Sequence, residues 1–144
     1  MPVVTPILTP RLLLRPPDAI DAALVFRRYA GDSAVTRFVG WPRHASIHDT
    51  AAFTGYVLAR DAWGFGYASE ALRAVVQLAK GLAVTHLYAL CHPSNSASIR
   101  VLERCGFTCE GLLPTRQVFP NLGAKPQDVA RYAYSSGSRL DAPL

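Results

Sequence analysis

The sequence predicts a mixed α/β fold of the α+β type, and two strand-to-helix connections carry this prediction. In the first, an apolar run at residues 55–59 leads through two glycines into apolar residues at helical spacing from Ala71 to Leu82. In the second, the apolar run 86–91 leads into a helix-capping sequence at residues 94–95. The sequence has no internal repeat, so strands and helices follow one another in a single mixed arrangement.

The N-terminal third predicts one short strand and two helices. The strand is expected over residues 11–15. Asp18 can cap a helix that runs to about Ala30, because apolar residues recur on one face of this segment. Residues 37–42 then read as a turn into a second short helix at residues 49–53.

The turn between Trp63 and Ala68 is the most informative part of the chain. Its two glycines let the backbone pass close to a ligand and take dihedrals that other residues resist. Free N–H groups and the positive end of the helix dipole then favour an anion, and a pyrophosphate is expected there. No Gly-Lys-Ser/Thr follows and the third Rossmann glycine is absent, so neither of those nucleotide motifs applies. A tight connection without a ligand remains the alternative.

The second motif runs from His92 to Phe107. Pro93 ends the preceding strand, Ser94 or Asn95 can cap a helix running to about residue 105, and Gly106 supplies a left-handed stop. Each of these residues therefore also has a sufficient structural role.

The remaining sequence predicts two strands and a tail. The strands are expected at residues 107–113 and 128–134, with a loop at 119–126 that is rich in turn residues. The polar segment 135–144 predicts a mobile tail.

Together the two motifs resemble the GNAT superfamily of acyl-CoA-dependent N-acetyltransferases, most closely its ribosomal-protein (RimJ/RimL-type) branch. The matching stretches are residues 9–16, 63–72 and 128–132, and the Asn95-x-x-Ser98 sequence running to Gly106 and Phe107. The resemblance implies a GNAT-like, mostly antiparallel sheet flanked by helices, in one domain over residues 1–144. Its parts would be the N-terminal elements (10–53), an acetyl-CoA-binding core (54–113), C-terminal strands (114–135) and the tail (136–144).

Acetyl-CoA is the donor that this resemblance implies, with no metal. The pyrophosphate would lie on the backbone of residues 63–68, and the pantetheine arm along the strand 55–59 and near the helix that follows Asn95. The implied cofactor-binding residues are Tyr56, Val57, Leu58, Trp63, Gly64, Phe65, Gly66, Tyr67, Ala68, Ser69, Asn95 and Ser98.

The second substrate would be a primary amine, which attacks the thioester directly. By analogy with the family, Ser98 is the first candidate to donate a proton to the thiolate, followed by Tyr132 or Tyr134. Glu110 and His92 are candidate general bases by position, with an ordered water as the alternative.

A gap follows Phe53, where the family has a meander of antiparallel strands. About 20–40 residues would be needed for it, so the central meander is predicted to be missing, or a segment of the sequence is absent. The strand 11–15 must then pair with residues 55–59 or find another partner, and exposed strand edges favour a homodimer. A CoA-binding protein that has lost catalysis through this deletion is the alternative function.

The charge and the cysteine content restrict which classes of protein and which cellular locations remain possible. The net charge of +5 is dispersed without a basic stripe or a stacking platform, which argues against a nucleic-acid-binding module. Arg60, Arg73 and Lys80 flank the turn and its helix, as CoA-attracting charges or as ordinary surface residues. The three cysteines have no metal-site spacing and indicate a reducing cytoplasm. No apolar stretch approaches 18 residues and no secretion signal is evident, so neither a membrane span nor export is expected.

Overall fold

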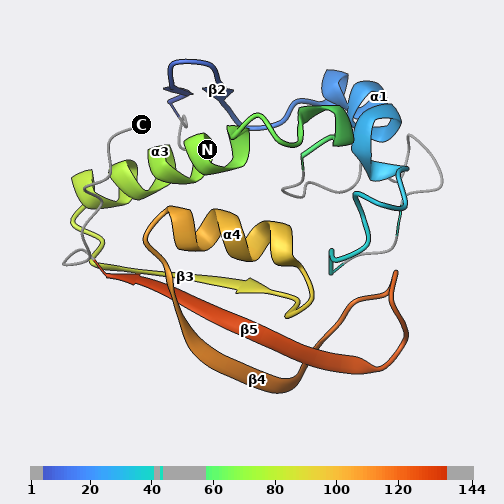
Figure 1. Ribbon diagram of the computed structural model, residues 1–144. Coiled ribbons are helices and arrows are strands. Elements are labelled where there is room, and N and C mark those ends of the chain that lie inside the picture. Colours follow the sequence, from blue (N-terminus) through green and yellow to red (C-terminus); the bar gives the residue numbers. More distant parts are fainter. Residues whose placement is uncertain (1–4, 41–42, 44–57, 136–144) are drawn as a thin grey trace. The chain divides into compact units, whose positions relative to one another are not determined.

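The computed structural model describes residues 5–40, 43 and 58–135 (Figure 1). The chain divides into two compact units, one made of residues 1–67 and 118–125 and the other of residues 68–117 and 126–144. Each unit is treated by itself below. Among the described residues, no helix has the length and apolar character needed to cross a membrane.

The first unit begins with a two-stranded antiparallel ribbon. Strand β1 (Ile7–Leu8) pairs with β2 (Leu13–Leu14). Thr9 closes the turn between them, since its N–H donates to the Leu12 carbonyl and its hydroxyl accepts from the Leu12 N–H, each at 2.9 Å. The predicted strand 11–15 is therefore shorter than expected, and its partner is the segment before it.

The helix predicted after Asp18 is confirmed, with three types of turn in succession. A 3-10 turn, η1 (Ala19–Asp21), continues into α1 (Ala22–Val25) and then into a π-helical turn, η2 (Phe26–Ala30). Asp18 accepts from the Ile20 N–H, and the Asp21 side chain accepts from the Asp18 N–H at 2.8 Å. This reciprocal capping box satisfies backbone donors that the helix start would otherwise leave unpaired.

The Asp21 carboxylate provides a prediction about pH. Both of its oxygens accept from Arg15 at 2.8 Å, and this hydrogen bonding, with that from the Asp18 backbone, lowers the pKa of Asp21 to about 2. Because the folded pKa is depressed, the stabilisation is complete above the unfolded value of about 3.9. It is lost as pH falls through about 2. An NMR titration of the Asp21 carboxyl should give a midpoint near that value, and Arg15→Gln should move the midpoint upward. A midpoint of about 3.9 in the unsubstituted protein would contradict the ion pair.

The second unit is a three-stranded sheet with helices packed on it. Helix α3 (Tyr67–Gly81) is followed by β3 (His86–Cys91), α4 (Ser96–Arg104), β4 (Thr108–Val118) and β5 (Pro126–Ser135). The strand order is β3-β5-β4, and β3 pairs antiparallel with β5 from His86 opposite Ser135 to Cys91 opposite Ala130. Figure 1 shows α4 lying over one face of this sheet. These elements confirm the helices and strands predicted for this part of the chain.

The two faces of the sheet differ in character. Alternate residues of β5 (Ala130, Tyr132 and Tyr134) join the core beneath the helices, as the period of two along a strand requires. Arg131, between them, faces the other way and lies over the Tyr88 ring at 4.1 Å. The remaining residues of the core cluster are Val76, Leu102, Cys105 and Phe107.

Strand β4 continues beyond its predicted end at residue 113. Pro114 has no N–H to donate, and Thr115 has a left-handed φ of 47° that a β-branched residue adopts only when held. The Thr115 N–H donates to Oδ1 of Asp128 at 3.0 Å, so a side chain of β5 replaces a backbone acceptor at the interruption. A proline is tolerated here because β4 is at one edge of this sheet.

Only the last two residues of the predicted strand 55–59 lie within the described part of the chain. Leu58 and Ala59 belong to no strand, and Ala59 leads directly into the 3-10 turn η3 (Arg60–Ala62). Tyr56 and Val57, the predicted helix 49–53 and the site of the missing meander lie outside the described residues. The prediction of a meander deletion, and of a homodimer through strand edges, therefore stays a prediction.

Candidate active site

The turn that precedes α3 has the backbone conformation that its two glycines predict. Gly64 and Gly66 have φ values of 82° and 81°, in the left-handed region that favours glycine. Trp63 donates its N–H to the Arg60 carbonyl at 3.1 Å, and the helix begins directly after the second glycine, at Tyr67. The chain thus reaches the helix start through a turn in which two residues carry no side chain that could obstruct a ligand.

Arg11 holds this turn from a distant point in the sequence. Its Nη1 donates to the Phe65 carbonyl at 2.9 Å, and its guanidinium carbon lies 4.8 Å from the centre of the Tyr67 ring. The Phe65 and Tyr67 rings stack with their centres 5.7 Å apart. Arg11 therefore both braces the turn and brings a permanent positive charge to it. Spacing could not reveal this contact, and the only signal was that residues 9–16 resemble the family.

The first residues of α3 combine buried and exposed positions. Ser69 is buried, and its carbonyl accepts from the Cys105 thiol of the segment after α4, at 3.5 Å. Trp63 and Phe65 remain half exposed, and the Trp63 indole N–H donates to the Leu58 carbonyl at 3.0 Å. The predicted donor residues thus contribute mainly backbone at this turn, while the Ser69 side chain faces the protein interior.

Asn95 caps α4, as one of its two predicted roles requires. Its Oδ1 accepts from the Ser98 backbone N–H at 3.2 Å. Within the described part of the chain, neither the Asn95 Nδ2 nor the Ser98 hydroxyl makes a hydrogen bond, and both residues are partly exposed. The cap therefore fixes the Asn95 side chain and leaves two polar groups on the first turn of α4 available to a ligand.

Tyr132 lies in the core of the second unit, only 4% exposed. Burial, together with the nearby Cys109 thiol, raises the pKa of the Tyr132 hydroxyl. A phenol whose pKa is raised keeps its proton at neutral pH, so this group can donate a proton but cannot serve as a base.

Glu110 lies on the opposite face of the sheet from Tyr132. Its Oε2 is 2.9 Å from Nε of Arg131, whose guanidinium covers the Tyr88 ring. The structure therefore does not bring Glu110 and Tyr132 together, although both were predicted as catalytic.

His92, the other candidate base, is engaged at both ring nitrogens. Nδ1 accepts from the Ser94 N–H at 3.0 Å, so the proton is on Nε2, which lies 2.9 Å from Oε1 of Gln127. To accept a proton, the ring must first break its bond to Ser94.

The position of Glu110 predicts that it has no acid–base role. Glu110→Gln should leave kcat/KM for acetyl transfer unchanged between pH 6 and 9, because the side chain faces away from α4 and Tyr132. A pH profile that loses its acidic limb in this variant would instead identify Glu110 as the base.

Comparison with known proteins agrees with this geometry. Residues 45–108 match the acetyltransferase (GNAT) domain family. This match covers less than half of the chain. Over 60 residues this chain is 38% identical to the uncharacterized N-acetyltransferase p20 of Bacillus licheniformis, and the aligned region covers 41% of this chain and 34% of p20. The match thus spans about a third of the length of this relative.

Solved structures establish that the fold around this segment is the GNAT fold. A GNAT-family acetyltransferase from Bacillus anthracis superposes with a TM-score of 0.78 at 23% identity, covering 91% of this chain and 98% of that one. The ribosomal-protein acetyltransferase RimL, in complex with coenzyme A, gives 0.72 at 20% identity, covering 93% and 96%. The predicted α+β fold with antiparallel sheets and flanking helices is confirmed. Among the described residues, no cluster of three or more His, Cys, Asp or Glu side chains could hold a metal.

Proposed function

We propose that the protein is an acetyl-CoA-dependent N-acetyltransferase that acts on a primary amine. The observation that carries the proposal is the turn at Gly64 and Gly66, which has two left-handed residues and opens directly into a 15-residue helix. Such a helix start presents unpaired N–H groups and a partial positive charge to an anion. In this fold, the anion that fits the site is the CoA pyrophosphate.

The proposed donor site uses residues of both sequence motifs, the turn at residues 63–68 and the start of the helix after Asn95. The backbone N–H groups of residues 65–68 would bind the pyrophosphate, with Arg11 adding charge at the same turn. The free Nδ2 of Asn95 would donate to a carbonyl of the pantetheine arm. The coenzyme A complex of RimL supports this assignment by analogy of fold.

The reaction is direct attack within a ternary complex. The neutral amine nitrogen forms a bond to the thioester carbonyl carbon, and the tetrahedral intermediate collapses with cleavage of the carbon–sulfur bond. The electron pair leaves on sulfur, which takes a proton from the Ser98 hydroxyl or from Tyr132. The attacking nitrogen loses its extra proton to water, and that proton restores the donor hydroxyl. A protein N-terminus, with a pKa of about 7.7–8.0, is already partly neutral near pH 7.5 and requires no strong base. This favours an N-terminal or similarly weakly basic amine as acceptor.

A CoA-binding protein without transferase activity is the second candidate. The observation that favours it is the state of the two predicted bases, because Glu110 faces away from Tyr132 and His92 is bonded at both nitrogens. Both candidates share the donor site, and only transfer of acetyl to an amine separates them.

Calorimetric titration with acetyl-CoA tests the donor site that both candidates require. We expect micromolar binding, with weaker binding of dephospho-CoA and of free pyrophosphate. The complex should then acetylate N-terminal amines in a peptide pool, as followed by mass spectrometry. Binding without any product would establish the second candidate, and no binding at millimolar acetyl-CoA would exclude both.

A further inference from the structure

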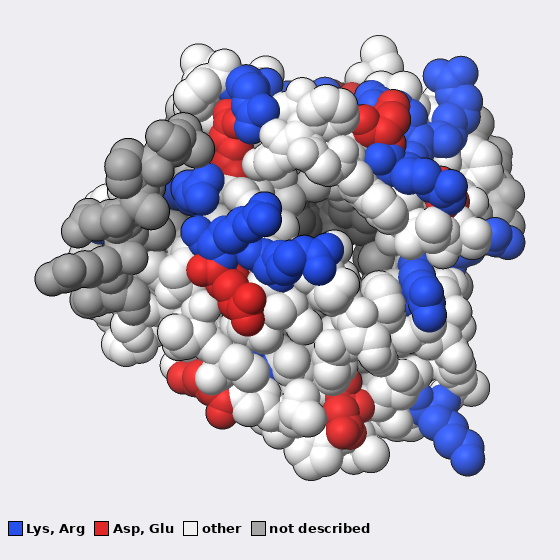
Figure 2. Space-filling model, viewed as in Figure 1, with Lys and Arg blue, Asp and Glu red and all other residues white. Residues whose placement is uncertain are grey.

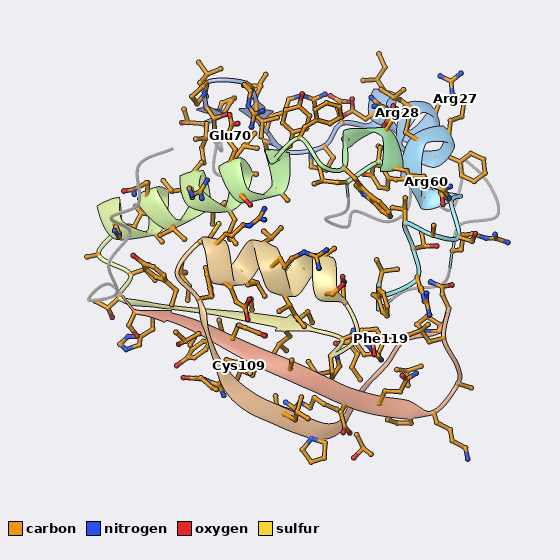
Figure 3. The ribbon with its side chains drawn as sticks, viewed as in Figure 1. Arg27, Arg28, Arg60, Glu70, Cys109 and Phe119 are labelled. Carbon is orange, nitrogen blue, oxygen red and sulfur yellow. The ribbon has the colours of Figure 1, made fainter. Side chains whose placement is uncertain are left out.

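An open hollow of about 450 Å³ lies on the first unit, and its lining residues are not among the donor-binding groups assigned above. Its lining comprises three arginines and one aspartate, namely Arg27, Arg28, Arg60 and Asp61. Figure 2 shows Lys and Arg side chains gathered on the surface over α1, with fewer acidic ones between them. In Figure 3 the labelled Arg27, Arg28 and Arg60 lie together on the first unit, two from the turn η2 and one from η3.

The positive charge of the hollow exceeds what Asp61 and the nearby Asp32 neutralise. Arg28 pairs with Asp61 at 2.7 Å, and Arg60 pairs with Asp32 at 2.6 Å. Arg27 has no hydrogen bond or ion pair with the described residues. One full positive charge therefore remains in an accessible hollow, where a carboxylate or phosphate would balance it.

The donors of the paired arginines are also incompletely used. Arg28 contacts both oxygens of Asp61 through Nη2 alone, and Arg60 likewise uses only Nη2 toward Asp32. Their Nη1 and Nε groups make no hydrogen bonds with the described residues. The aspartates thus hold two guanidinium groups in place without occupying them. A guanidinium presents its remaining N–H groups in a planar fork that matches an oxyanion.

The hollow adjoins the donor turn along the chain. Arg60 starts η3, and its carbonyl accepts the N–H of Trp63, where the turn begins. Because the donor would already fill the turn, a separate acidic molecule in the adjoining hollow would be the second substrate of the transfer. We propose that this arginine hollow binds a carboxylate or phosphate group of the amine acceptor, an inference that rests on the proposed function. The enzyme would accordingly prefer acidic acceptors.

Matched peptide acceptors test this preference. The pair Ala-Glu-Glu-Tyr and Ala-Gln-Gln-Tyr differ only in charge, and kcat/KM is measured for both at low salt. Arg27→Gln should lower kcat/KM for the acidic peptide about tenfold, the scale of one charge-assisted hydrogen bond, and leave the neutral peptide unchanged. Arg116→Gln removes the same charge from an exposed position on β4 and should change neither value. Equal effects of Arg27→Gln on both peptides would overturn the proposal.

Two further measurements separate this inference from its alternatives. Binding of the N-acetylated acidic peptide requires no catalysis, so a Kd that rises in Arg27→Gln supports the hollow even if the protein transfers no acetyl group. A Kd that is the same in both proteins would overturn the proposal. The 3′-phosphate of CoA is the other source of an anion, and it is tested by the ratio of Kd values for dephospho-CoA and CoA. That ratio should be unchanged in Arg27→Gln, and its collapse toward one would assign the hollow to the donor instead.

Discussion

Replacing Gly66 with alanine is expected to weaken acetyl-CoA binding about tenfold, because the turn requires a backbone conformation that L-residues resist by about 1–2 kcal/mol. The φ at this position is 81°. Space is not the obstacle, since among the described residues an added Cβ would meet only Nη2 of Arg11, at the ordinary contact distance of 3.6 Å. The substitution therefore acts on the population of the turn that presents its N–H groups, and calorimetric Kd values for acetyl-CoA measure the effect.

Gly81→Ala is the matched control. Gly81 ends the same helix and has no left-handed φ, and in the described part of the chain an added Cβ there would meet nothing within 4 Å. Acetyl-CoA should bind this variant with unchanged Kd, and its thermal stability should be the same or slightly higher because alanine favours helix. If Gly66→Ala bound acetyl-CoA as tightly as Gly81→Ala, the turn could not be the pyrophosphate site.

Ser98→Ala is expected to lower kcat about 100-fold, the lower range for loss of a general acid, with the Kd for acetyl-CoA unchanged. The helix cap should survive, because Asn95 accepts from the backbone N–H of residue 98, which alanine retains. The variant thus removes the free hydroxyl and little else. Single-turnover rates under saturating acetyl-CoA measure the chemical step directly.

Two further variants serve as a control and as a test of the alternative proton donor. Ser96→Ala removes an exposed hydroxyl from the same first turn of α4 and should leave kcat unchanged. Tyr132→Phe removes the other candidate donor. A large loss in Tyr132→Phe with full activity in Ser98→Ala would transfer the role to the buried tyrosine.

Local chemistry made much of the fold and of the donor turn predictable. The left-handed positions of Gly64 and Gly66 and the cap at Asn95 depend on contacts within a few residues, which the sequence displays. The alternation of exposed and partly buried residues along β3 follows in the same way from the period of two along a strand.

The features that the sequence did not reveal depend on long-range contacts. The orientation of Glu110 depends on how β4 aligns with β5, and that alignment includes an interruption held by Asp128. Arg11 reaches the Phe65 carbonyl across 54 residues, so no spacing rule could find it. The arginine hollow likewise joins side chains 33 residues apart through the Arg28–Asp61 pair. Such contacts are fixed by tertiary packing and leave no periodic trace in the sequence.

The order of strands in the second unit also has a consequence for how the protein is made. β5 is the last of these strands to leave the ribosome, yet it is the middle strand of the sheet and supplies Ala130, Tyr132 and Tyr134 to the core. Until it is synthesised, β3 and β4 have no partner between them, and Leu102 and Phe107 face water. The second unit therefore cannot complete its fold until residue 135 has emerged from the ribosome. During that interval the nascent chain depends on protection from aggregation.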